Sequence, residues 1–264
     1  MKRFLCDELP TPNHPVRLDS REKNHARQVL RLKPDALVEV LDGKGHACIA
    51  RIQYQDQELL LHHDAEASNL RQAPKDEIIP VTLEAAVLKG DAFEWLIEKA
   101  TELGVKELTP IKTLRTVVKW NQEKEKKLLE RWTKISNQSL KQCGRLNGMK
   151  INPPRRLSEV IQAPAPAPNE IRLFCNETLA PERSHHLMTW IYSALSKKPC
   201  PWSHFRILVG PEGGFDPSEI ELITSSSSLP HQSVSLGPVV TRAETASLYA
   251  ISLVSGFFRS DMSK

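Results

Sequence analysis

The pattern of apolar and polar positions divides the chain into a short-stranded first part and a longer second part. The first part contains three β-prone runs, at residues 36–41, 46–54 and 58–63. A turn at Asp42-Gly43 separates the first two runs, which is a hairpin signal. Because short antiparallel strands of this kind tend to close on themselves, we predict a compact β-barrel over residues 1–73.

A short helix is expected ahead of these strands. Ser20 is its predicted N-cap, and Arg27 and Arg31 are four positions apart, so both are expected on one helical face. After the strands, residues 64–79 have little apolar content and are expected to form a linker.

From Val81 onward, strand patterns alternate with helix patterns. The expected strands are residues 81–87, 108–111, 116–119, 171–175, 205–209 and 233–236. The expected helices are residues 91–103, with Asp91 and Glu94 in a capping-box pattern, 121–143, 181–196, a helix from Pro217, and 241–258. This order predicts an α/β domain over residues 74–264, built on a mainly parallel sheet with helices on both faces.

The last of these helices is apolar almost all round its circumference. Its apolar positions include Leu248, Tyr249, Ile251, Val254 and Phe257. Such a helix must be covered by the sheet, by a second subunit, or by both. We therefore expect a homodimer.

Composition narrows the class of protein. The 264 residues are 40% hydrophobic and 26% charged, which excludes collagen-like, mucin-like and wholly disordered chains. No apolar run reaches the roughly 20 residues that span a bilayer, and the N-terminus lacks a signal-peptide pattern. The five cysteines are scattered and form no Cys-x-x-Cys pair, which argues against a zinc site. We expect a cytoplasmic protein with reduced thiols.

Positive charge is concentrated in one segment. Residues 112–156 contain 13 Lys and Arg against three Glu and no Asp, an excess of +10, whereas the whole chain carries +4. A solvated helix face can have such a composition, but the size of the excess favours a polyanionic partner, most simply nucleic acid. The expected nucleic-acid contacts are Lys126, Lys127, Arg131 and Lys134 on the long helix, Arg145 after it, and Arg3, Arg27 and Arg31 in the barrel.

A glycine-rich segment, Gly210–Phe215 (the first loop), follows an apolar strand and precedes a well-specified helix start. Asp216 is the expected N-cap, followed by Pro217 and, at the third helical position, Glu219. Glycines let the backbone approach a ligand, and ligands of open α/β sheets bind at the carboxyl ends of strands. The segment matches neither a P-loop nor a dinucleotide fingerprint. A plain strand-to-helix turn is the alternative.

A second strand-to-helix segment, Leu236–Arg242 (the second loop), contains Gly237. Thr241 and Glu244 fit a capping box at the start of the last helix. Arg242 places a cation against the helix dipole, which a buried or ligand-facing role would explain. Two glycine-containing loops at the same edge of a sheet could frame one pocket.

Together these segments resemble the RsmE family of bacterial methyltransferases, which modify a uridine at N3 in 16S ribosomal RNA. The matching segments are Leu208–Phe215, Leu236–Pro238, Arg242–Ala246, Lys99–Val105, Gln142–Arg145, Val29–Lys33 and Asp42-Gly43. The resemblance covers nearly the whole chain in the family's order.

The resemblance implies a PUA-like, RNA-binding barrel followed by a SPOUT-class α/β domain with a C-terminal trefoil knot. It implies S-adenosylmethionine (SAM) as methyl donor, a homodimer, and 16S ribosomal RNA within the small ribosomal subunit as partner. No metal is required, because the donor is already electrophilic. The donor site that it implies comprises Leu208, Val209, Gly210, Gly213, Gly214, Leu236, Gly237, Val239 and Val240.

Two residues are candidates for the chemistry. Arg242 could stabilise negative charge that develops on the uracil oxygens, and Glu244 could orient Arg242, cap the helix or accept the N3 proton. The family usually has Arg-Ile-Leu where this chain has Val239, Val240 and Thr241. Because a cation is therefore missing from the second loop, a non-catalytic RNA-binding protein of the same fold is an alternative. A related SPOUT enzyme that methylates a ribose 2′-oxygen is another.

Overall fold

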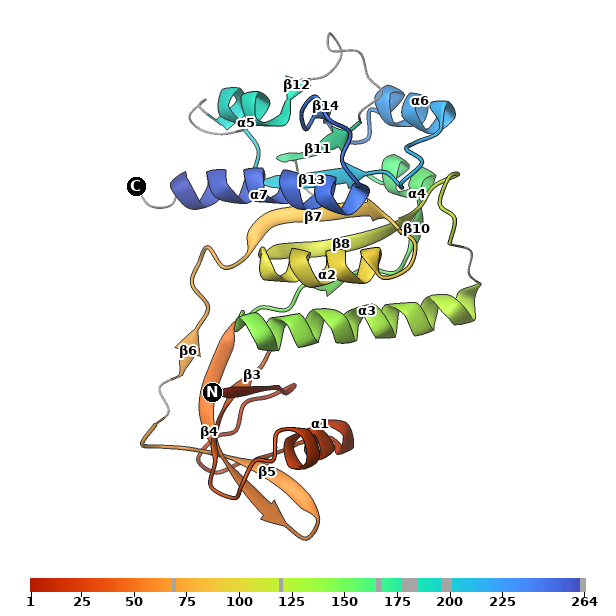
Figure 1. Cartoon of the computed structure of the whole chain (residues 1–264). Coiled ribbons are helices and arrows are strands. Elements are labelled where there is room, and N and C mark those ends of the chain that lie inside the picture. The colour runs from red at the N-terminus through yellow and green to blue at the C-terminus, as the bar shows by residue number, and fades with distance from the viewer. Residues whose placement is uncertain (68–69, 119–120, 165–167, 177–184, 196–200, 262–264) are drawn as a thin grey trace. The chain divides into compact units, whose positions relative to one another are not determined.

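The computed structural model describes residues 1–67, 70–118, 121–164, 168–176, 185–195 and 201–261. The chain forms two compact units. The first unit contains Met1–Glu77 and Asn137–Gly148, and the second contains Ile78–Ser136 and Met149–Lys264. Figure 1 shows both units with the chain coloured from its N-terminus to its C-terminus.

The first unit is built on a six-stranded sheet in the order β1-β3-β4-β5-β2, with β6 paired to β4. Its strands are β1 (Lys2–Leu5), β2 (Val16–Arg17), β3 (Leu37–Leu41), β4 (His46–Gln55), β5 (Glu58–His63) and β6 (Arg71–Gln72). The three strands predicted from the sequence are confirmed. The sheet curves around a core that includes Phe4, Val38, Ile52 and Leu61. Since β1 and β2 end the described sheet without pairing with each other, it is a half-barrel and not the closed barrel that the pattern predicted.

The helical segment before these strands begins one residue earlier than predicted. Asp19, not Ser20, is the N-cap of α1 (Ser20–Asn24), because its carboxylate accepts the backbone N–H of Glu22 at 2.7 Å. A π-helix, η1 (His25–Val29), continues it. Arg31 then has φ +49°, so it does not share a helical face with Arg27 as predicted.

The first unit also takes in the last turns of α3 (Gln122–Cys143) and the residues that follow. Arg3 donates to the carbonyl oxygens of Lys141 and Gln142, both at 3.0 Å, and so satisfies the carboxyl end of the helix. Glu77 accepts the backbone N–H of Leu146 at 2.8 Å. The sequence pattern predicted a boundary between residues 73 and 74, and it gave no sign that residues 137–148 would pack with the N-terminal unit.

The second unit is an α/β structure on an eight-stranded sheet in the order β10-β8-β7-β13-β11-β14-β12, with β9 on β8. Its strands are β7 (Ile79–Ala86), β8 (Val105–Lys112), β9 (Lys150–Ile151), β10 (Arg155–Arg156), β11 (Glu170–Cys175), β12 (His185–His186), β13 (His204–Val209) and β14 (His231–Ser235). The recorded pairings in this sheet are parallel, as predicted. The carboxyl ends of the strands therefore meet at one edge.

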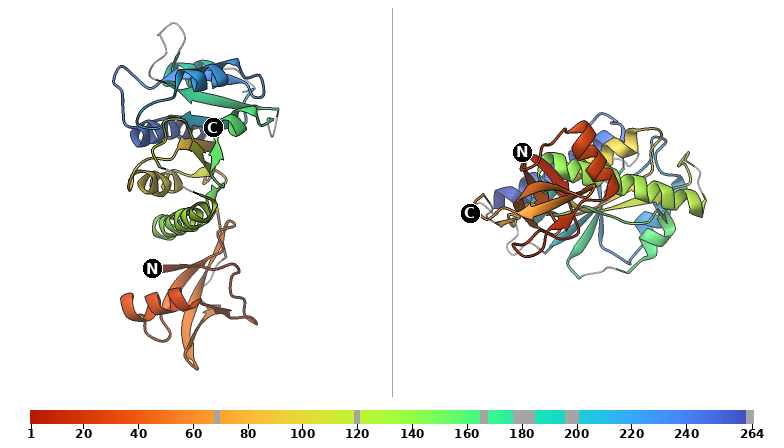
Figure 2. Two further views of the ribbon diagram at one scale, coloured as in Figure 1. Left: turned by 90° about the vertical axis from the view of Figure 1, so that its right-hand side faces the viewer. Right: turned by 90° about the horizontal axis from the view of Figure 1, so that it is seen from below.

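Helices cover both faces of this sheet, which confirms the predicted layers. In the described part of this unit there are five helices in addition to the first part of α3. They are α2 (Ala92–Glu102), α4 (Leu157–Gln162), α5 (Leu187–Leu195), α6 (Pro217–Ser225) and α7 (Ala243–Asp261). Figures 1 and 2 show α2 and α7 on the same side of the strands. Alternate strand residues such as Leu83 and Ile207 face these two helices, while Phe174 and Leu208 face α4 and α6.

Three predicted elements of the second unit differ from the structure. Asp91 precedes α2 but makes no capping bond; Glu94 instead pairs with Arg131 at 2.6 Å. Thr116–Val118 is not a strand, and residue 119 lies outside the described residues. The helix expected at 181–196 begins at Leu187, because His185-His186 form β12, and residues 181–184 and 196 are likewise outside the described residues.

Candidate active site

The first loop folds back on itself after β13, so that the side chain of its last residue, Phe215, packs against its first residue, Gly210. The ring of Phe215 lies so close to Gly210 that a Cβ there would be 2.8 Å from the ring. Phe215 in turn packs edge-on against Phe174, with 5.3 Å between the ring centroids. Gly214 has φ +67°, a conformation that side chains other than glycine rarely adopt. Gly210 and Gly214 are therefore required by the backbone path itself.

The helix that follows the first loop has the predicted capping box. The Asp216 carboxylate accepts the backbone N–H of Ser218 at 3.1 Å, and Glu219 accepts the backbone N–H of Asp216 at 3.0 Å. Hydrogen bonds from Ser218 hold the pKa of the Asp216 carboxyl below its ordinary value, and the nearby Arg115 adds to this effect. Glu219 is buried and also accepts the backbone N–H of Leu114, at 2.8 Å.

Two further contacts join the first loop to the loops that follow β7 and β8. Arg115 donates to the carbonyl oxygen of Gly213 at 2.9 Å and lies 3.5 Å from the Asp216 carboxylate. The backbone N–H of Lys89 donates to Glu212 Oε1 at 3.0 Å. Lys89 and Arg115 were not predicted as site residues, although both follow strands that end at the same edge of the sheet.

The second loop is less constrained. Gly237 has φ +135°, and a Cβ there would meet nothing within 4 Å. The side chains of Val239 and Val240 are each 72% exposed. The capping box predicted for Thr241 and Glu244 is wrong: α7 begins at Ala243, and no described residue hydrogen-bonds to either side chain.

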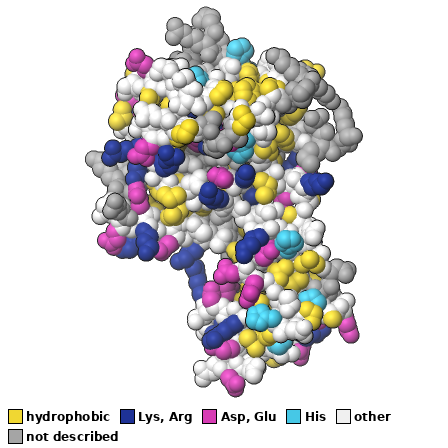
Figure 3. Space-filling model, turned by 180° about the vertical axis from the view of Figure 1, so that it is seen from behind, with side chains coloured by type: hydrophobic (Ala, Val, Ile, Leu, Met, Phe, Trp, Pro, Cys, Tyr) yellow, Lys and Arg dark blue, Asp and Glu magenta, His cyan; other side chains and the backbone are white. Residues whose placement is uncertain are grey.

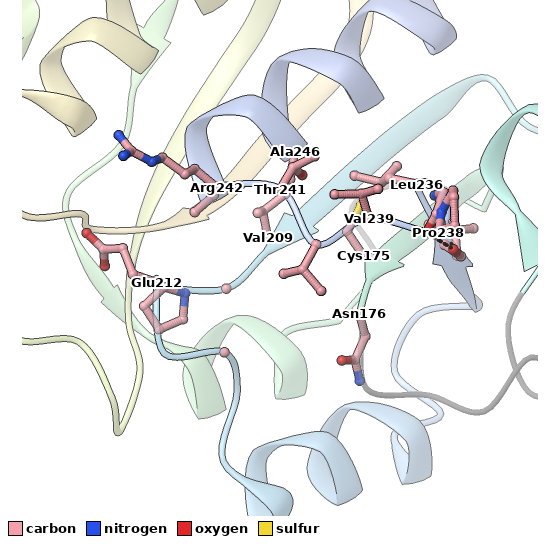
Figure 4. Close-up of a pocket in the computed structure, with 18 of the residues that line it drawn as sticks. Cys175, Asn176, Val209, Glu212, Leu236, Pro238, Val239, Thr241, Arg242 and Ala246 are labelled. Carbon is pink, nitrogen blue, oxygen red and sulfur yellow. Dashed lines mark hydrogen bonds between the residues drawn. The ribbon is translucent and has the colours of Figure 1, made fainter.

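The two loops frame a cavity of about 770 Å³ at the carboxyl edge of the sheet (Figure 4). Its lining residues come from both loops, from the ends of β11 and β12, and from the start of α7. They are Cys175, Asn176, His186, Val209–Glu212, Gly214, Val234–Ala243 and Ala246. A cavity of this size suits a nucleoside-sized ligand.

Most of the predicted donor-site residues lie together in this cavity. Val209, Gly210, Gly214, Leu236, Gly237, Val239 and Val240 line it, as does the catalytic candidate Arg242. Leu208, Gly213 and Glu244 are not among the lining residues. Leu208 points to the opposite face of the sheet, where it packs with Phe174 and Phe215, because successive strand residues alternate between faces.

Several lining residues were not predicted. Cys175 and Asn176 end β11, and His186 ends β12. The rule that parallel strands present their carboxyl ends at one edge could have identified the first two. Glu212 lies within the predicted first loop but was given no role. Figure 4 shows Glu212 and Arg242 at the same end of the cavity, with their side chains extending in the same direction.

The predicted RNA-binding residues differ in their exposure to solvent and in whether other side chains already pair with them. Arg3 binds Glu39 and the end of α3, Arg27 lies 4.7 Å above the ring of Tyr54, Arg31 is exposed, and Arg145 is only 5% exposed. On α3, Lys127 pairs with Glu123 and Arg131 with Glu94, whereas Lys126 and Lys134 are exposed without a recorded ionic partner among the described residues. Figure 3 shows Lys and Arg interspersed with Asp and Glu on the face it presents.

Comparison with known proteins identifies the family. Residues 74–255 match the model of an RNA methyltransferase domain, and residues 18–60 match an RNA methyltransferase PUA domain. Ribosomal RNA small subunit methyltransferase E of Synechocystis is 30% identical over 245 residues, which are 93% of this chain and 74% of that protein. The chain belongs to the ribosomal RNA small subunit methyltransferase E family. The Bacillus subtilis member is 32% identical over 177 residues, 67% of this chain and 66% of its own length.

Solved structures agree with this family assignment. A putative methyltransferase from Legionella pneumophila, in complex with SAM, has a TM-score of 0.81 at 25% identity and covers 97% of both chains. The family member from Neisseria gonorrhoeae, bound to SAM, has a TM-score of 0.75 at 25% identity, covering 97% of this chain and 98% of that one. The fold is therefore a PUA-like N-terminal domain with an α/β methyltransferase domain. No helix among the described residues is long and apolar enough to cross a membrane.

Proposed function

We propose that the protein transfers a methyl group from SAM to N3 of a uridine in 16S ribosomal RNA. The observation that carries this proposal is the 770 Å³ cavity built by the two glycine-containing loops, in a chain of the small subunit methyltransferase E family. Related structures of the same fold hold SAM. The resemblance of the sequence motifs to that family supplies the position on the base.

The residues that line the cavity fit this donor. Val209, Leu236 and Ala246 offer apolar surface, while the glycines leave backbone groups accessible. The open space above Gly237 opens into the cavity, so a ligand can come against the backbone there. The first and second loops would hold SAM, which supplies an electrophilic methyl group when bound.

Arg242 has the properties of a donor to the developing charge on uracil. It lines the cavity, is exposed, and forms no recorded ion pair or hydrogen bond through its side chain with any described residue. A guanidinium that is not already neutralised can donate to a uracil carbonyl oxygen as negative charge develops there. Glu244 lies outside the cavity lining, so it has no direct part in this proposal.

The RNA-binding surfaces extend the proposal to both units. We assign the PUA-like unit and the exposed cations of α3 to RNA phosphates, with Lys126 and Lys134 as the freest of the predicted contacts. Arg3, which binds the end of α3, and Arg145, which is buried, are the less accessible of the predicted contacts. We also propose that the protein acts in the cytoplasm, on RNA of the small ribosomal subunit.

The finer architecture follows the same family resemblance. We assign a trefoil knot of the SPOUT class to the C-terminal part, supported by the packing of α7 against β7 and β13 after the chain has left β14. We also assign a homodimer. The helices α5 and α7 pack against each other, and both carry exposed apolar side chains. Met188, Tyr192 and Tyr249 are 52%, 75% and 41% exposed. Sedimentation that showed an active monomer at micromolar concentration would contradict the dimer.

Analysis of the product nucleoside tests the proposed function. Protein, SAM with a labelled methyl group, and 16S ribosomal RNA or small subunits are incubated, and the RNA is digested to nucleosides. We expect the label in 3-methyluridine. Label in a 2′-O-methylated nucleoside would support the alternative SPOUT chemistry, and RNA binding without any transfer would support the non-catalytic alternative.

A further inference from the structure

The cavity contains few groups that could accept a proton. Among its described lining residues, the side chains with acid–base chemistry near neutral pH are Glu212, His186 and Cys175. Cys175 is 6% exposed and belongs to the hydrophobic core. The choice therefore falls between a carboxylate and an imidazole.

His186 is poorly placed for this task. Its Nδ1 lies 3.3 Å from the backbone N–H of Met188, which donates to it. In the neutral ring the proton is then on Nε2, so neither nitrogen can accept another proton from a substrate without losing that bond. His186 also lies on β12, three strands from β13 in the sheet, which is about 14 Å at the usual strand spacing.

Glu212 has the geometry that His186 lacks. It lies on the first loop, three positions after the end of β13, is exposed, and lines the cavity at the same end as Arg242 (Figure 4). The backbone N–H of Lys89 holds Oε1 at 3.0 Å, which orients the carboxylate and leaves Oε2 available. Among the described residues, no Lys, Arg or His forms an ion pair with Glu212, so no cation occupies Oε2.

The loop that carries Glu212 is itself fixed. Arg115 binds the carbonyl oxygen of Gly213, and buried Glu219 ties the start of α6 to Leu114. A proton acceptor must be positioned before the reaction, since misplacement of a reacting group costs rate. Glu212 thus stands on a loop that contacts with neighbouring segments hold in place.

We propose that Glu212 accepts the N3 proton of the target uracil, an inference that rests on the proposed function. As the N3–H bond breaks, the proton goes to Glu212 Oε2 and the N3 electron pair forms the bond to the methyl carbon. The sulfur–methyl bond breaks, and its electron pair remains on sulfur, which becomes a neutral thioether. Arg242 donates to a uracil oxygen meanwhile, and exposed Glu212 afterwards releases the proton to water.

The first test removes the base but keeps the shape. Glu212→Gln retains an oxygen that can accept the Lys89 N–H, so the loop keeps its tie. We expect single-turnover methylation of uridine-containing RNA to fall about 10²- to 10⁴-fold with little change in SAM affinity. Glu221→Gln, the same chemical change at an exposed position of α6, is the matched control and should leave the rate unchanged.

A more acidic substrate separates catalysis from structure. RNA with 5-fluorouridine at the target position has a more acidic N3–H, which needs less help from a base. The defect of Glu212→Gln should therefore shrink by at least about tenfold on this RNA. A variant that only distorts the loop would lower the rate on both RNAs by the same factor, which would overturn the proposal.

A binding measurement without donor gives an independent readout. If Glu212 accepts N3–H, wild type should bind uridine-containing RNA about tenfold more tightly than the same RNA with 3-methyluridine, since a hydrogen bond to a charged group is lost. Glu212→Ala should reduce this preference to near unity. An unchanged preference would contradict the assignment.

The outcomes distinguish this inference from the proposed function. If wild type forms no 3-methyluridine, the proposed function fails, and this inference fails with it. If wild type forms 3-methyluridine and Glu212→Gln forms it at the same rate, the function stands and the inference alone is wrong.

Discussion

The two loops that frame the cavity are both strand-to-helix connections with a glycine and a capping-box pattern, yet they are held differently. In the first loop, Asp216 and Glu219 form the capping box, and contacts from Lys89 and Arg115 join the loop to its neighbours. In the second loop the capping box does not form, and Val239 is 72% exposed. One wall of the cavity is thus fixed before any ligand arrives, and the other is open.

This difference shows what a capping-box pattern requires beyond its residue types. Glu219 is 6% exposed and receives a second backbone N–H from Leu114, so burial and a tertiary contact reinforce the local bond. Glu244 lies on a half-exposed turn with no comparable contact. Water competes with such a local hydrogen bond when it is exposed, which makes the net gain small.

The largest combined effect, on stability and on SAM binding together, is expected from the two glycines. Gly210→Ala places a Cβ 2.8 Å from the Phe215 ring, so we expect about 1–3 kcal/mol loss in the free energy of unfolding and loss of SAM binding. Gly237→Ala meets no atom within 4 Å, so its cost is backbone strain, and its main effect should be on SAM affinity. Urea unfolding and calorimetric titration measure both. No loss of stability in Gly210→Ala, or unchanged SAM affinity in Gly237→Ala, would contradict this account.

The two capping glutamates provide the next contrast. Glu219→Ala leaves the backbone N–H groups of Leu114 and Asp216 without their acceptor, and should cost about 2–4 kcal/mol of unfolding free energy. Glu244→Ala should change it by less than about 0.5 kcal/mol, as for an ordinary surface substitution. Denaturant unfolding of both variants checks this, and a similar loss in both would show that the second loop is capped after all.

A smaller effect is expected from the tie between the first loop and the loop after β8. Arg115→Ala removes the donor to the carbonyl oxygen of Gly213, and SAM affinity should fall by up to about tenfold. Lys126→Ala, which removes an exposed cation from α3, serves as the control and should leave SAM affinity unchanged. Calorimetric titration with SAM compares them; undiminished affinity in Arg115→Ala would mean that the loop holds its shape without this contact.

The smallest effect concerns pH. The pKa of the Asp216 carboxyl is lowered in the folded chain, so its stabilising contribution is present above its unfolded pKa and is lost as pH falls through its folded pKa. Asp216→Asn should lower stability at neutral pH and flatten its decline in acid. Asp91→Asn, at an N-cap position without a side-chain bond, should leave that pH profile as in wild type. Thermal unfolding at a series of pH values measures this. A loss of stability in acid that is as steep in Asp216→Asn as in wild type would contradict the prediction.

The sequence predicted the fold well where a strong local pattern agreed with burial. The strands that flank Asp42-Gly43, the parallel sheet and the capped start at Pro217 are confirmed. The half-barrel and the packing of residues 137–148 with the first unit depend on contacts between distant segments, which periodicity does not encode. The cavity's two loops were predicted because each is a local glycine-containing motif. The hydrogen bond between Lys89 and Glu212 joins distant segments, so it was not predicted.

Amide hydrogen exchange, measured with and without SAM, tests most directly that the cavity has one fixed wall and one open wall. Backbone N–H groups of Gly214 and Asp216 are already bonded in the structure, to Pro211 and Glu219. We predict slow exchange there in both states, and a strong slowing across Leu236–Arg242 only when SAM is bound. Fast exchange at Gly214 and Asp216 without SAM, or no change across Leu236–Arg242 on adding it, would contradict the account.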